Sequence, residues 1–65
     1  MRIELNGETR DVNSTLLHDI LAECGYQHEH IATALNGDFV HKSARTSTAL
    51  NEGDRLEVVA PISGG

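Results

Sequence analysis

Hydrophobic and polar residues alternate in several short segments of the chain. Over residues 1–5 every second residue is apolar, which is the period of a strand with one buried face. Asn6-Gly7 follows, and this dipeptide favours a type I′ hairpin turn because both central positions of that turn need positive φ. We expect residues 8–12 to form the return strand of this hairpin. It is polar up to Val12, as is typical of a strand at the edge of a sheet.

A different spacing follows, with apolar residues three or four positions apart. This spacing predicts an amphipathic helix over residues 15–24, with polar residues on its outer side. Asn13, Ser14 and Thr15 supply side-chain oxygens that we expect to cap the first turn. Gly25 stands where a residue of positive φ ends many helices. The apolar stripe consists of Leu16, Leu17, Ile20, Leu21 and Cys24.

The remaining alternation predicts a second hairpin and a final strand. The same Asn-Gly signal separates residues 31–35 from residues 38–40, which are expected to pair. Residues 41–49 are small and polar, so we expect a loop or a single short helical turn there. Residues 55–60 form the last predicted strand, because apolar residues again recur at every second position.

The order of elements is therefore hairpin, helix, hairpin, loop and strand. One helix can cover only one face of one sheet, so this order predicts a two-layer α+β domain. We expect residues 1–60 to form the domain and residues 61–65 to form a C-terminal tail. The expected core consists of Ile3, Leu5, Val12, Leu16, Leu17, Ile20, Leu21, Leu35, Val40, Leu50, Leu56 and Val58, together with one of Ile31 and Phe39.

The composition narrows the class of function. The 65 residues include ten acids and five bases, and the formal net charge of −5 disfavours nucleic acid as a partner because phosphates are repelled. No apolar run approaches the roughly 20 residues of a membrane span, and no signal-peptide pattern opens the chain. The single cysteine excludes an internal disulfide, so we expect a reducing cytoplasm. A domain of this size leaves little room for a pocket of ~300 Å³, which argues against a self-contained enzyme. We expect the protein to be a monomer on its own.

Two other sets of side chains are candidates for chemistry. Cys24 is a potential nucleophile or sulfur relay, but its place on the apolar helix face favours a packed and inert thiol. Cys24, His28, His30 and His41 do not have a usual zinc spacing, so we expect no metal site. The acids are expected to form a solvated surface that suits a basic patch on a partner.

The C-terminal residues are the most informative part of the sequence. Pro61 cannot donate a ladder hydrogen bond and is expected to end the last strand. Five extended residues reach at most about 17 Å. Because Gly64 and Gly65 have no side chains, such a tail can enter a channel wide enough only for backbone. The alternatives are a frayed end or a cloning scar.

Two apolar residues near the tail are candidates for docking to a partner. Val59 faces away from Leu56 and Val58 on the last predicted strand, so we expect it on the open face of the sheet. Ile62 lies in the tail itself. Exposed apolar residues beside a functional segment predict a docking patch, and scattered surface residues are the alternative.

Three segments together resemble the ThiS/MoaD family of sulfur carriers, which have a ubiquitin-like β-grasp fold. They are LNGDFV at residues 35–40, LNEGDRLEVV at residues 50–59 and PISGG at residues 61–65. The resemblance covers essentially the whole chain, and the length favours the ThiS type over the longer MoaD type. It implies a mixed sheet of four to five strands with one helix packed on one face. His41-Lys42 departs from the family pattern, in which proline followed by a basic residue is frequent.

The resemblance also implies a sulfur-carrier cycle in thiamine (thiazole) biosynthesis. A ThiF-like adenylyltransferase converts the Gly65 carboxylate to an acyl-adenylate, and sulfur that comes from cysteine through a desulfurase then replaces AMP. A ThiG-like thiazole synthase takes the sulfur from the resulting thiocarboxylate. Gly65 is then the sulfur-carrying residue, present as 1-thioglycine, and Gly64 and Ser63 give access to it.

In this cycle the protein binds no cofactor and has no catalytic residue, because it is the substrate of its partners. The alternatives are a MoaD-like or other-pathway sulfur carrier, a ubiquitin-like protein modifier, and a passive β-grasp interaction domain whose glycines have no role.

Overall fold

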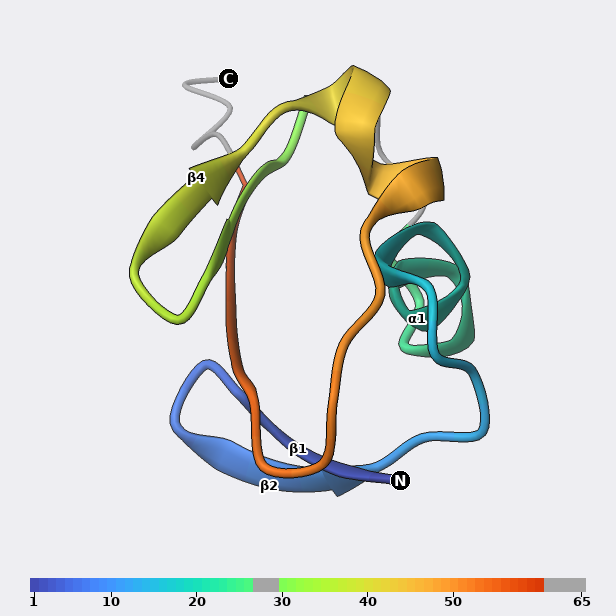
Figure 1. Cartoon of the computed structure of the whole chain (residues 1–65). Coiled ribbons are helices and arrows are strands. Elements are labelled where there is room, and N and C mark those ends of the chain that lie inside the picture. Colours follow the sequence, from blue (N-terminus) through green and yellow to red (C-terminus); the bar gives the residue numbers. More distant parts are fainter. Residues whose placement is uncertain (27–29, 61–65) are drawn as a thin grey trace.

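The structure, a computed structural model, describes residues 1–26 and 30–60. Within these residues it has five strands, one α-helix and one 3-10 helix (Figure 1). The elements are β1 (Arg2–Leu5), β2 (Glu8–Asp11), α1 (Leu17–Glu23), β3 (Ala32–Leu35), β4 (Asp38–Val40), η1 (Lys42–Ser47) and β5 (Arg55–Val59). No helix in this part of the chain is long and apolar enough to cross a membrane.

The five strands form one mixed sheet in the order β2-β1-β5-β3-β4. Each hairpin is antiparallel, and β5 lies between the two hairpins. It is parallel to β1, with Leu5 opposite Leu56, and antiparallel to β3, with Thr33 opposite Val58. Figure 1 shows α1 on one side of the sheet. The two-layer α+β fold and the mixed sheet predicted from the sequence are therefore confirmed.

Both hairpin turns have the backbone that their Asn-Gly sequences predict. Asn6 and Asn36 each have a φ of 50°, and Gly7 and Gly37 follow with φ values of 84° and 88°. Two successive positive φ values define the type I′ turn, whose twist matches that of the strands on either side. The local sequence therefore determines where both hairpins reverse.

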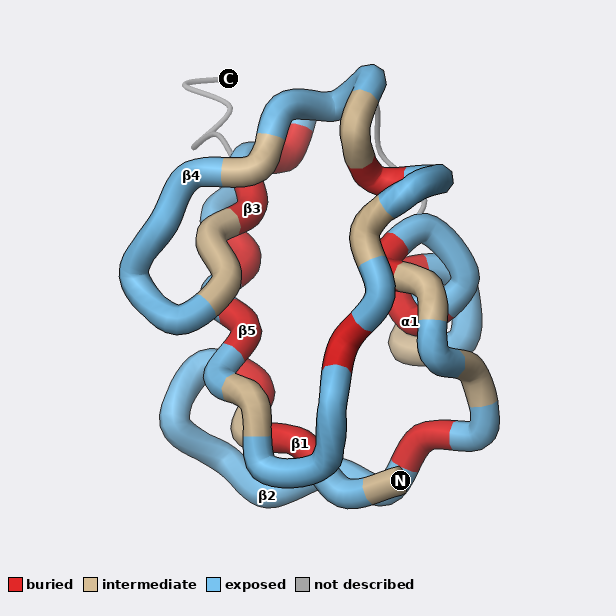
Figure 2. The backbone as a smooth tube through the Cα atoms, in the orientation of Figure 1, coloured by how far each residue is buried: buried red, intermediate tan, exposed pale blue. Residues whose placement is uncertain are grey.

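The core lies between the sheet and α1, where the buried residues gather in Figure 2. Of the two alternatives left open by the sequence, Ile31 is buried, whereas 63% of the Phe39 surface is exposed. Leu16, Leu35 and Val40 are only half-buried. The buried apolar residues are Ile3, Leu5, Val12, Leu17, Ile20, Leu21, Ile31, Leu50, Leu56 and Val58.

The start of the helix differs from the prediction. The helix begins at Leu17 and not at residue 15, and its N-cap residue, Leu16, makes no side-chain cap hydrogen bond. The expectation that the three preceding polar residues cap the helix is therefore wrong. The reason is a long-range contact: Leu17 N–H donates to the Thr48 carbonyl at 2.8 Å, and Leu50 N–H donates to the Thr15 carbonyl at 2.8 Å. This pairing holds the segment extended.

A carboxylate from the far end of the helix stabilises that extended segment instead. Glu23 accepts hydrogen bonds from Asn13 N–H at 2.8 Å and from Ser14 N–H at 3.1 Å. These bonds, the one from Asn13 above all, lower the pKa of the Glu23 carboxyl below its ordinary value of 4.5. The side chain thus links the last turn of α1 to the loop that precedes it.

The predicted polar loop after β4 contains a buried arginine. Residues 42–47 form a 3-10 helix that is longer than the single turn expected from sequence. The Arg45 guanidinium donates to the Ile31 carbonyl at 2.6 Å and to Thr33 Oγ1 at 3.2 Å. Thr33 Oγ1 donates in turn to the Val40 carbonyl at 3.0 Å. These hydrogen bonds connect η1 to the second hairpin.

We expect Glu23→Gln to lower the melting temperature at pH 7 by a few degrees and to flatten the acid side of the stability curve. A carboxyl whose pKa is lower in the folded protein stabilises it above the unfolded pKa, which is near 4.5. That contribution disappears as the pH falls through the folded pKa, and the glutamine variant lacks it at every pH. Thermal unfolding between pH 7 and pH 3 measures the difference. The exposed Glu8→Gln serves as the control, and parallel curves for wild type and Glu23→Gln contradict the assignment.

Candidate functional site

The candidate site begins where β5 ends. The predicted tail residues Ile62, Ser63, Gly64 and Gly65 lie outside the described residues, so their roles remain predictions. The structure does describe β5, the strand that precedes this segment in the sequence. In the strand order β5 lies between β1 and β3; its backbone pairs with β1 only at Arg55 and Leu56, whereas the pairing with β3 continues to Val59.

Backbone hydrogen bonds hold β5 on both sides. Towards β1, Glu4 N–H donates to the Asp54 carbonyl and Asn6 N–H donates to the Leu56 carbonyl, both at 2.9 Å. Towards β3, Asn36 N–H donates to the Arg55 carbonyl at 2.8 Å. These bonds hold the first part of β5 on both sides, whereas beyond Leu56 the backbone pairing continues only with β3, up to Val59 opposite Ala32.

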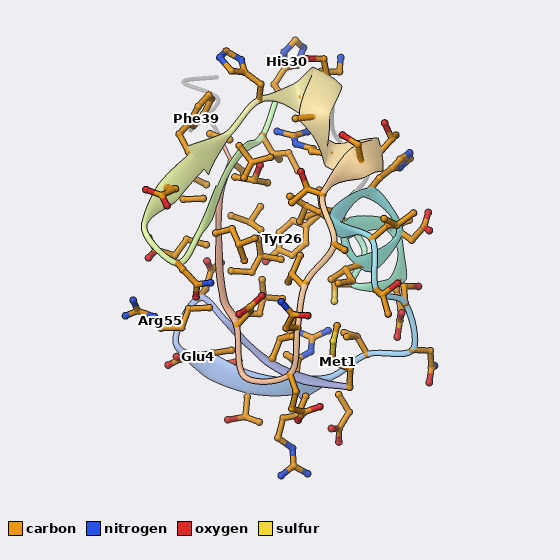
Figure 3. The ribbon with its side chains drawn as sticks, in the orientation of Figure 1. Met1, Glu4, Tyr26, His30, Phe39 and Arg55 are labelled. Carbon is orange, nitrogen blue, oxygen red and sulfur yellow. The ribbon has the colours of Figure 1, made fainter. Side chains whose placement is uncertain are left out.

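An apolar band crosses the open face of the sheet beside the end of β5. We define this band as Ala32, Ala34, Phe39 and Val59. Val59 lies opposite Ala32, and Phe39 lies opposite Ala34. Val59 is 64% exposed, as its position in the strand pattern predicted, and Phe39 points away from α1 in Figure 3. The two large side chains thus flank small alanines on a surface that α1 does not cover.

Phe39 is the residue of this band that the sequence left undecided. The register decides it, because Val40 lies opposite the buried Thr33 and the residue before Val40 must then face the other way. The sequence contains this information, because side chains alternate along residues 38–40: once Val40 is assigned to the core, Phe39 must lie on the open face. The Phe39 ring also meets the His41 ring edge to face, with centroids 5.0 Å apart.

The other half of the open face is polar. Here a hollow of about 290 Å³ is lined by Glu4, Asn6, Gly7, Arg55, Leu56 and Glu57. Glu4 and Arg55 lie on the side of the sheet away from α1 (Figure 3). The apolar band and the polar hollow therefore lie on the same face, beside different parts of β5.

Where the structure describes them, the other candidate groups do not assemble into a second site. Cys24 is partly buried and packs against the core, as predicted. Among residues 1–26 and 30–60, no three His, Cys, Asp or Glu side chains lie close enough to hold a metal ion. His28, which belonged to the zinc alternative, lies outside that part of the chain. What the described site offers is a fixed strand end beside an exposed surface.

Comparison with known proteins agrees with this geometry. A crystal structure of the thiamine biosynthesis protein ThiS from Geobacter metallireducens superposes with a TM-score of 0.80 at 26% identity, and all of both chains is covered. A solution structure described as a thiamine biosynthesis protein from the same organism has a TM-score of 0.73 at 25% identity, with 100% of this chain and 88% of that chain covered.

The sequence comparisons point the same way. A protein from Paramagnetospirillum magneticum named thiazole synthase is 36% identical over 66 residues, and this chain spans only 20% of its length. The ThiS family matches residues 3–65. With the fold in agreement and the family match covering residues 3–65, the chain belongs to the ThiS family.

Proposed function

We propose that the chain carries sulfur for thiazole formation on its C-terminal glycine, Gly65. The observation that most supports this proposal is the extent of the family match, which runs to residue 65 and so includes Gly64 and Gly65. The position of β5 agrees with it, because the strand that precedes the tail in the sequence is paired with β3 up to Val59.

The chemistry of a terminal carboxyl explains why a partner enzyme is needed. An α-carboxyl group has a pKa near 3.5 and is ionised at pH 7. As an anion it resists attack by a nucleophile. A carboxylate oxygen of Gly65 therefore attacks the α-phosphate of ATP on an adenylyltransferase, and pyrophosphate leaves. The resulting acyl-adenylate has AMP as its leaving group.

Sulfur enters in the second step. A desulfurase takes sulfur from cysteine as a persulfide, and the terminal sulfur of that persulfide attacks the Gly65 carbonyl carbon and displaces AMP. A thiol then reduces the resulting acyl disulfide, which leaves the thiocarboxylate (1-thioglycine) and a disulfide. A thiazole synthase then accepts the sulfur. The similarity to part of a protein named thiazole synthase supports this pairing of carrier and acceptor. The chain itself is a substrate in each step and not the enzyme.

The apolar band is the proposed docking surface for these partners. Val59 and Phe39 are exposed apolar side chains on the open face, and Ile62 in the tail is proposed to extend the contact. A partner that covers the band removes apolar surface from water while the adjoining tail enters its active site. The acidic surface suits a partner with basic residues around that contact.

We expect Gly64→Val to lower the rate of adenylation by at least about a hundredfold, because a branched side chain next to the reacting residue shifts the carboxylate in a channel that fits only backbone. ATP–pyrophosphate exchange with the cognate adenylyltransferase measures this rate. Thr9→Val places the same valine side chain on the exposed edge strand β2, outside the tail, and should exchange at the wild-type rate. Undiminished exchange by Gly64→Val, at an unchanged far-UV circular dichroism spectrum, would refute the narrow channel.

We expect Val59→Asp and Phe39→Asp each to reduce kcat/KM for adenylation about tenfold, since a charge must then be buried against an apolar partner surface. His18→Asp places an aspartate on the exposed side of α1 and controls for the added charge. Steady-state pyrophosphate exchange over a range of carrier concentrations gives kcat/KM. If all three variants behave alike, the apolar band is not the docking surface.

A further inference from the structure

Asn6 has a second role besides forming the first hairpin turn. Its φ of 50° ends β1, so the backbone of β1 cannot continue alongside β5. Up to that point, every second residue along the chain donates its backbone N–H to a carbonyl of the β5 segment: Glu4 N–H to the Asp54 carbonyl, and Asn6 N–H to the Leu56 carbonyl. The next residue of β5 at this spacing, two positions after Leu56, is Val58.

The side chain of Asn6 takes the place of the missing strand at this next step. Val58 N–H donates to Asn6 Oδ1 at 2.8 Å, and Asn6 Nδ2 donates to the Val58 carbonyl at 3.2 Å. One amide group therefore satisfies both backbone groups of Val58, as the backbone of a neighbouring strand would. The hydrogen-bonded edge of β5 is extended past the end of β1 by a side chain.

This extension occurs at a position where β5 would otherwise be held on one side only. Val58 is buried, with 6% of its surface exposed, and Val59 next to it pairs with Ala32 of β3. Without the Asn6 amide, both polar groups of the Val58 backbone would have to find water, at a cost to the order of the strand end. Pro61, the first residue of the proposed tail, follows Val58 by only three positions.

We infer that Asn6 is a positioning residue for the activation of Gly65: its amide fixes the end of β5 and so sets where the tail begins. This inference rests on the proposed function. If the strand end is already ordered in the free carrier, the adenylyltransferase does not have to order it on binding. The free energy of binding is then not reduced by the cost of that ordering. Loss of the amide therefore raises the KM for the carrier and leaves kcat unchanged, because the bound complex is the same.

The second Asn-Gly turn supplies a matched control. Asn36 has the same φ of 50° and also bonds to the β5 segment: Arg55 N–H donates to Asn36 Oδ1 at 2.9 Å, and Asn36 Nδ2 donates to Asp54 Oδ1 at 3.2 Å. These contacts are at the start of β5, far along the strand from the tail. A change at Asn36 thus removes an equivalent contact without touching the strand end.

The test compares Asn6→Gly with Asn36→Gly. Glycine keeps the positive φ of each turn and removes only the side-chain amide. In pyrophosphate exchange with the cognate adenylyltransferase, we expect Asn6→Gly to raise the KM for the carrier about tenfold, the effect of ordering roughly one residue, with kcat unchanged. Asn36→Gly should keep the wild-type KM even if its melting temperature falls as far as that of Asn6→Gly. Asn6→Asp, which retains the acceptor for Val58 N–H, should lie between wild type and Asn6→Gly.

Amide hydrogen exchange of Val58, followed by NMR, provides a readout that does not depend on activity. We expect Asn6→Gly to accelerate this exchange at least about tenfold and Asn36→Gly to leave it near the wild-type rate. Equal KM values for the two glycine variants, or unchanged Val58 exchange in Asn6→Gly, overturn the inference. If wild type is not adenylated at all, the proposed function fails, whereas the exchange of Val58 still decides whether Asn6 holds the strand end.

Discussion

The pairing of β5 on both sides is the constraint on which the rest of the structure depends. The strand joins two local hairpins that would otherwise share no hydrogen bonds, since the sheet order places it between β1 and β3. Its alternation also separates the two faces: Leu56 and Val58 are buried under α1, whereas Val59 is exposed on the other side. An isolated hairpin is only marginally stable in water, so the domain depends on this central strand.

The same strand connects stability to function. A carrier needs a terminus that several partners can reach and a body that each of them can recognise. Because β5 ends beside the apolar band, the segment that is proposed to react and the surface that is proposed to be recognised both adjoin this strand. The remaining open face is polar and contains the hollow next to Glu4 and Arg55, so the two halves of one sheet offer different surfaces to a partner.

Much of this architecture was readable from the sequence. The two Asn-Gly dipeptides located both hairpins, and the period of the apolar residues located the strands, the helix and most of the core. These signals are local. The start of the helix was missed because residues 15–17 are held by a distant segment at residues 48–50, and no local capping rule contains that information. Arg45 was missed because charged residues are usually exposed, and only the packed η1 reveals the carbonyl that it binds.

The site was predictable to a lesser extent. Val59 followed from alternation within one strand, whereas Phe39 required the register between β3 and β4. The second role of Asn6 required more still, because it depends on which strand lies next to β1 in the sheet. A turn residue is recognised from its neighbours in the sequence, but a contact 52 residues away is determined by the order of the strands.

The most direct test of the account is the intact mass of the chain purified from its native host while that host makes thiamine. If Gly65 carries sulfur, one fraction of the chain has one oxygen replaced by sulfur, and fragmentation of that fraction should place the sulfur on Gly65. A chain that has the unmodified mass in every fraction, under conditions in which thiazole is being formed, would contradict the central claim.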